Sequence, residues 1–208
     1  MALQDFFSNF HLLIRWLHII SGITWIGLLY FFNFINLPLQ ASLDDAAKKA
    51  VNPQLMPRAL WWFRWGAMST FLMGWILFTM KYMYAPGTGF GPTSLFVSDH
   101  QITARAVWIL MGMAFGSIMW FNVWFVIWPS QKKILSGQFS GDALTALRTR
   151  AAKASRINTF LSGPMLFGMI GAPNYGAVNP LTLLVYIAIA MIVVKTAYTL
   201  SLKVGVKK

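Results

Sequence analysis

Cysteine is absent from this 208-residue chain, and acidic residues are nearly absent. Without cysteine the protein forms no disulfide, no thiolate-bound iron–sulfur cluster and no covalent CxxCH heme attachment. All five acids fall outside the long apolar runs: Asp5, Asp44, Asp45, Asp99 and Asp142. A bundle built from those runs therefore offers no carboxylate as proton relay, general base or hard-metal ligand.

Charged residues of any kind are also scarce, at 11% against 57% hydrophobic residues, and the mean hydropathy is +0.59. A soluble domain usually carries about a quarter charged residues. The sequence therefore predicts an all-α membrane protein, a single domain over 1–208 built as a bundle of five transmembrane helices. The five apolar segments run approximately over 10–37, 58–84, 102–128, 157–172 and 180–202.

The lysines and arginines between these segments fall on one side of the predicted membrane. The basic side holds Lys48, Lys49, Arg58, Lys132, Lys133, Arg148, Arg150, Lys153, Arg156, Lys203, Lys207 and Lys208. The opposite segments, 1–9, 85–101 and 173–179, hold none. By the positive-inside rule we expect a multi-pass protein of a bacterial inner membrane, with a periplasmic N-terminus and a cytoplasmic C-terminus. The excess of basic residues then indicates topology and not nucleic-acid binding.

The longest basic loop predicts one further helix. Ser140 can cap a short helix whose first turn carries Asp142, and small and apolar residues alternate there with arginine and lysine. We expect this short cytoplasmic amphipathic helix to lie on the anionic surface of the lipid bilayer. A solvated loop is the alternative.

Ionisable groups inside a membrane are costly and are candidates for function. Lys195 and Arg64 lie close enough to the inner end of their segments to extend toward the headgroups. Arg15 and His18 are harder to explain in this way, because they share a helix face with Gly22 and Trp25 that should point into the bundle.

A metal site built from several histidines is excluded by spacing. His11 and His18 are seven residues apart, about 10.5 Å along a helix, whereas zinc ligands lie about 2.0–2.1 Å from the ion. His100 is expected at the depth of His11, near the outer surface. His18 is therefore the one histidine expected within the membrane.

A single histidine is sufficient to ligate heme, so heme b is the expected cofactor, with Arg15 near a propionate and His18 as metal ligand. His18 lies about 12 Å below the outer surface. Met73 of the second segment and Met111 and Met113 of the third lie at the same depth. His18 is then either a lone ligand or paired with methionine. The alternative is a histidine that only forms a hydrogen bond within the bundle.

Three further features concern packing. Gly112 and Gly116 form a GxxxG spacing that permits close helix contact. Pro164 predicts a kink in the fourth segment. Asn122 is a buried amide that needs a hydrogen-bond partner.

Several stretches resemble the membrane N-terminal domain of bacterial urate hydroxylases. They are Arg15–Gly27 (RWLHIISGITWIG), Trp62–Ala67 (WFRWGA), Gly116–Met119, Asn122–Val123, Pro129–Lys133, Arg156–Asn158 and Pro164–Ile170. They touch four of the five segments in order. The first stretch also resembles the membrane heme-biosynthetic oxidases, whose equivalent histidine is thought to bind heme.

The resemblance implies a membrane oxidoreductase linked to a quinone or a cytochrome. We expect the chain to depart from the pattern: it should lack two spans between its second and third and the cytochrome c domain, and Leu110 and the 172–175 stretch are expected where the family tends to have histidine. We expect a small heme b-binding redox subunit that passes electrons near the periplasmic face to other membrane subunits or a cytochrome c. The alternative is a non-catalytic accessory subunit of a larger membrane complex.

Overall fold

The computed structural model describes residues 3–85, 87, 89–91, 102–174 and 177–205. Two long helical runs open the chain: α1 (Leu3–Tyr30), η1 (Phe31–Asn36) and α2 (Leu37–Ser42), then α3 (Asp45–Phe78) and η2 (Thr79–Met83). A two-stranded hairpin, β1 (Tyr84–Ala85) and β2 (Gly89–Phe90), follows. The remaining elements are α4 (Ala104–Phe121), η3 (Asn122–Ile127), α5 (Trp128–Leu135), α6 (Gly141–Asn174) and α7 (Pro180–Ser201). The η elements are π-helical turns that continue their neighbours.

The predicted helical membrane character is confirmed. Within the described residues, three helices are long and apolar enough to cross a membrane: Asp5–Ser42, Ala104–Leu135 and Pro180–Ser201. They correspond to the first, third and fifth predicted segments. α3 and α6 are each 34 residues long, but tryptophan, glycine and polar residues dilute their apolar stretches. The prediction of five spans is thus supported for three, and the short β1–β2 hairpin adds a strand pair that was not expected.

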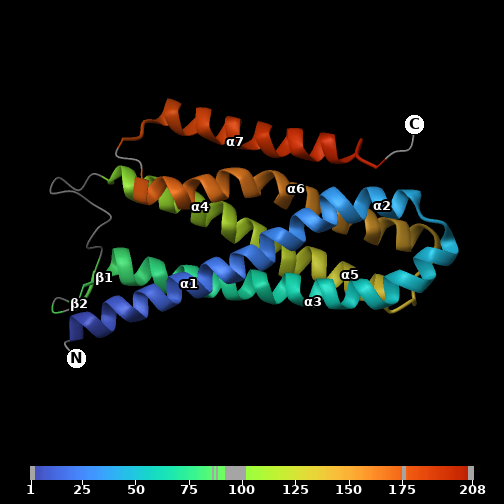
Figure 1. The fold of residues 1–208 in the computed structure, drawn as a ribbon, viewed down its shortest axis with the longest axis horizontal. Coiled ribbons are helices and arrows are strands. Elements are labelled where there is room, and N and C mark those ends of the chain that lie inside the picture. The colour runs from blue at the N-terminus through green and yellow to red at the C-terminus, as the bar shows by residue number, and fades with distance from the viewer. Residues whose placement is uncertain (1–2, 86, 88, 92–101, 175–176, 206–208) are drawn as a thin grey trace.

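The basic segment at 141–156 differs from its prediction. It is not a separate short helix, because α6 begins at Gly141 and runs without interruption through the fourth predicted span to Asn174. No proline stands between Gly141 and Pro164, and several alanines favour helix throughout this stretch. Even Pro164 lies inside α6. The basic segment therefore extends the bundle lengthwise (Figure 1).

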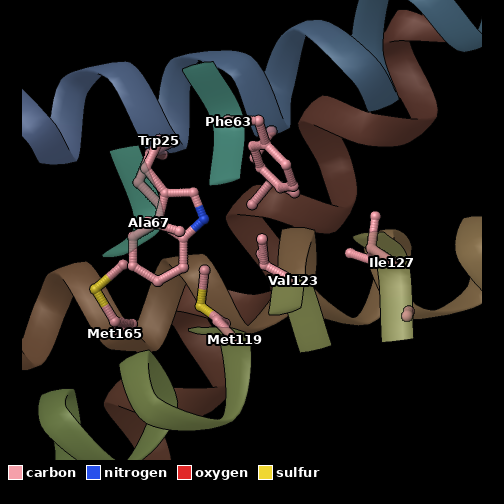
Figure 2. Packing of buried hydrophobic residues seen from close by; sticks show 10 residues of the cluster. Trp25, Phe63, Ala67, Met119, Val123, Ile127 and Met165 are labelled. Atoms are coloured by element: carbon pink, nitrogen blue, oxygen red, sulfur yellow. The ribbon is translucent and has the colours of Figure 1, made fainter. Parts of the chain in front are cut away.

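The core lies where α1, α3, α4 and α6 meet. Figure 2 shows Trp25, Phe63, Met119 and Met165, one from each of these helices, gathered with other buried side chains of the cluster. Trp25 and Phe63 are each only 2% exposed. α7 lies along α6 at the edge of the bundle (Figure 1).

Glycines bring α4 and α6 into backbone contact. A Cβ atom on Gly168 would lie 2.8 Å from the Gly112 nitrogen and 2.8 Å from the Trp108 oxygen. A Cβ on Gly112 would meet the Met165 oxygen at 3.2 Å. The close contact predicted from the GxxxG spacing is confirmed at Gly112, whereas Gly116 faces only the Met165 side chain.

Amide side chains join the helices in the half of the bundle nearer the basic segment of α6. Asn122 donates to Asn158 Oδ1 at 2.8 Å, and Asn158 donates to the Met119 carbonyl at 2.9 Å. This supplies the partner that Asn122 was expected to need. Asn33 donates to the hydroxyl of Ser155 at 2.8 Å. Asn33 and Asn122 both lie in π-helical segments, which change the direction in which a side chain leaves the helix.

Candidate functional site

His18 of α1 faces α3 and is half-buried. Its Nδ1 lies 2.9 Å from the backbone oxygen of Thr70. A carbonyl oxygen only accepts, so Nδ1 carries the proton and donates it. The Nε2 atom is then left with its lone pair, which is the form of imidazole that binds a metal.

Two residues of α3 determine the position of the His18 ring. Thr70 is almost fully buried, and its hydroxyl donates to the Gly66 oxygen at 2.7 Å. One turn further, a Cβ atom on Gly74 would lie 3.1 Å from His18 Cε1 and 3.5 Å from Nδ1. Glycine at 74 therefore leaves the space that the imidazole occupies. The sequence analysis identified neither Thr70 nor Gly74. The signal that could have pointed to Gly74 was a glycine at the predicted depth of His18.

A cavity of about 50 Å³ borders His18. Its walls come from α1, α3, α4 and α6: His18, Trp25, Thr70, Phe71, Gly74, Trp75, Met113, Gly116, Ser117, Met165 and Met169. They bring together one imidazole, three thioethers and three large aromatic rings. The cavity also borders the core, since Trp25 and Met165 belong to both.

The three methionines predicted for the site differ in whether they line the cavity. Met113 lines the cavity with His18, whereas Met73 and Met111 are not among its lining residues. Met165 and Met169 of α6 line it and were not predicted. The contact of α6 with α4 through Gly168 and Gly112 places them there, and this contact depends on the packing of two helices distant in sequence.

Arg15 lies one helical turn from His18 toward the N-terminus, and its side chain is exposed outside the cavity. It lies near three other basic residues, His11, Lys81 and Arg105, since the charges of Arg15 and Lys81 act on His11 and those of Arg105 and Arg15 act on Lys81. Lys81 and Arg105 escaped the sequence analysis because they lie within the ends of predicted spans. His100 lies outside the described residues.

The two other intramembrane cations take different positions. The Arg64 guanidinium stacks over the Trp128 ring at 3.9 Å, a cation–π contact between α3 and α5. Lys195 is exposed on α7. Neither lines the cavity.

The donor set of the cavity suits heme. A histidine whose second nitrogen is tied to a backbone carbonyl is the usual arrangement for a metal ligand, thioethers are known axial partners of histidine, and the aromatic walls are apolar. The volume does not suit heme in this conformation, because small-molecule pockets measure about 300–1,000 Å³. A macrocycle enters only if the cavity walls move apart.

This architecture, long apolar helices packed around His18, defines a helical membrane protein. Among families of known proteins, the chain matches the one described as "Urate oxidase N-terminal" over residues 4–51 and 90–205. The chain belongs to this family, which confirms the resemblance to the urate hydroxylase membrane domain. The match leaves out 52–89, and with it most of α3 and the Trp62–Ala67 stretch. No curated protein and no solved structure matches the chain significantly.

Proposed function

We propose that the protein is a small heme b-binding redox subunit of a bacterial inner membrane, in which His18 Nε2 would hold the iron once the cavity walls have moved apart to admit the macrocycle. The observation that carries this proposal is the hydrogen bond from His18 Nδ1 to the Thr70 oxygen at 2.9 Å. It fixes the ring orientation and makes Nε2 a better donor. The cavity that His18 lines also contains three thioethers, which a histidine serving only to join α1 to α3 would not need.

The remaining residues have distinct roles in this proposal. Met113, Met165 and Met169 are the candidates for the second axial position, since all three line the cavity. Arg15, one turn nearer the end of the bundle, would neutralise a propionate. Trp25, Phe71 and Trp75 would form aromatic walls beside the iron-binding atoms. When bound, the heme supplies one-electron transfer, and the partner is another membrane subunit or a cytochrome c.

The proposal includes five crossings, by α1, α3, α4, α6 and α7. α3 lies along α1, and α6 lies along α4 (Figure 1). A helix of 34 residues is about 51 Å long, well above the hydrocarbon thickness of about 30 Å. The Lys/Arg distribution supports a periplasmic N-terminus in this proposal. A cysteine at position 138 should react with an impermeant reagent only from inside, and labelling in intact cells would disprove this topology.

The optical spectrum of the purified protein tests heme binding. Protein from cells competent in heme synthesis should show a Soret band and a reduced-minus-oxidised difference spectrum. His18→Ala should remove the band, whereas the matched control His11→Ala, seven residues away on the same helix, should keep it. Met113→Leu, Met165→Leu and Met169→Leu then identify the second ligand, because loss of a thioether lowers the potential.

A colourless, folded wild-type protein would contradict the proposal and favour an accessory subunit. One observation already favours that second candidate. α7 exposes a long series of apolar side chains, among them Leu184, Val185, Ile189, Ile192 and Val193. Lipid or another subunit can cover this face. Co-purification of a stable complex with colourless protein would establish the accessory role.

A further inference from the structure

A groove of about 300 Å³ lies between α5 and the first half of α6, at the basic end of the bundle. Its lining residues are Lys133, Phe139, Ala143, Ala146, Leu147 and Arg150. The four residues from α6 are spaced at i, i+3, i+4 and i+7, so they form one stripe of that helix. The groove thus has an apolar floor with a cation on each of its two helices.

The positive charge of the groove is not balanced by the described residues. The ion pair found among them joins Lys48 to Asp45, on another helix. Asp142 is the one acid of the α5–α6 hairpin, and it is exposed in the first turn of α6. Three more cations of the same hairpin do not line the groove: Lys132, Arg148 and Lys153. The two lining cations suit an anionic occupant.

The helix register places both cations at headgroup depth. Trp128 begins α5, and Lys133 lies about 7.5 Å further along the helix. Each headgroup layer of a bilayer is about 5–8 Å thick. The contacts of Gly112 with Gly168 and of Asn122 with Asn158 set an antiparallel register that brings Arg150 near Ser130, two residues after Trp128. If Trp128 marks the interface, the two cations lie beside lipid phosphates.

We propose that this groove binds one anionic phospholipid, with its phosphate between Lys133 and Arg150 and its acyl chains directed into the bilayer, away from Phe139. The proposal rests on the membrane crossing proposed above and is independent of heme. The depth of the two cations distinguishes the site from one for a soluble oxyanion, because the acyl chains of a lipid held there remain in the bilayer.

Native mass spectrometry of the detergent-solubilised full chain tests the site. The probes are phosphatidylglycerol, phosphatidylcholine and inorganic phosphate. Wild-type protein should retain one phosphatidylglycerol in preference to phosphatidylcholine. Lys133→Gln/Arg150→Gln should weaken this binding about 25-fold, since each cation at a lipid surface is worth about a fivefold change. Lys132→Gln/Lys153→Gln removes the same charge from the same hairpin outside the groove and should weaken it less than about threefold.

Three results would overturn the proposal: equal weakening by the two double variants, equal binding of the two lipids, or displacement of the lipid by inorganic phosphate at similar concentration. Arg150→Gln alone provides a second variant in case the double variant unfolds, and it should weaken phosphatidylglycerol binding about fivefold. A protein that keeps its Soret band but retains no lipid contradicts the groove alone. Colourless protein that retains lipid contradicts the heme proposal alone.

Discussion

The two halves of the bundle differ in the hydrogen bonds of their buried polar side chains. In the half nearer the basic end, amides and hydroxyls of different helices bond to one another, as Asn122 does with Asn158 and Tyr30 with Ser162. Around the cavity, Ser21 of α1 and Ser69 of α3 also pair, at 2.8 Å between their hydroxyl oxygens, but among the described residues His18 bonds only through Nδ1. Interhelical pairs stabilise helix packing, whereas a ring nitrogen without a hydrogen bond beside a cavity can bind a ligand. Four substitutions test this contrast, in order of decreasing expected effect.

The largest effect is expected at the contact of α4 with α6, on which both halves depend. Gly168→Ala places a Cβ atom 2.8 Å from backbone atoms that cannot rotate away. We expect a loss of about 3 kcal/mol in the free energy of unfolding, measured by thermal unfolding in detergent. Gly27→Ala is the control, because a Cβ there meets nothing within 4 Å and should stabilise the helix by about 0.5–1 kcal/mol. Equal unfolding temperatures for both variants would contradict the described contact.

The amide network should show the behaviour of a paired structural site. Asn158→Leu leaves the Asn122 amide without its partner in a buried environment, which should cost about 2 kcal/mol. Replacing both residues by leucine should recover most of that loss, because no orphaned amide remains. Unfolding of the two variants in detergent gives the comparison. A double variant less stable than Asn158→Leu would assign the pair a further role.

A substitution beside the cavity should change heme affinity more than it changes the free energy of unfolding. Gly74→Ala pushes on the His18 ring, which can rotate, so we expect little unfolding but at least about a tenfold loss of heme affinity. Heme titration followed at the Soret band measures this loss. Gly22→Ala serves as control, since its Cβ would lie 3.8 Å from Thr70 Cγ2, an ordinary contact. Unchanged heme affinity in Gly74→Ala would show that Gly74 does not position the His18 ring.

The smallest effect is expected for the exposed intramembrane cation. Lys195 lines neither cavity nor groove, and its side chain is exposed on α7. Lys195→Gln should change the free energy of unfolding by less than about 0.5 kcal/mol and leave the Soret band unaltered. A large change in either measurement would show that the charge of Lys195 contributes to stability or to heme binding.

The sequence determined those features that depend on local pattern. Long apolar runs and one-sided basic residues are sufficient for a helical membrane protein, because the bilayer requires each span to satisfy its own backbone hydrogen bonds. The same patterns singled out His18 and Gly112, and they indicated that Asn122 needs a partner. They were misleading at 141–156, where a change from basic to apolar composition suggested a boundary that α6 crosses.

Only the tertiary structure decided which residues meet. Thr70, Gly74, Met165 and Met169 reach His18 or its cavity because α3 and α6 pack on α1 and α4 in one particular register. That register depends on glycine contacts between helices far apart in sequence, and a shift of one residue turns a side chain by about 100° around its helix. The depth of His18 could therefore be estimated along a single helix, but its partners could not.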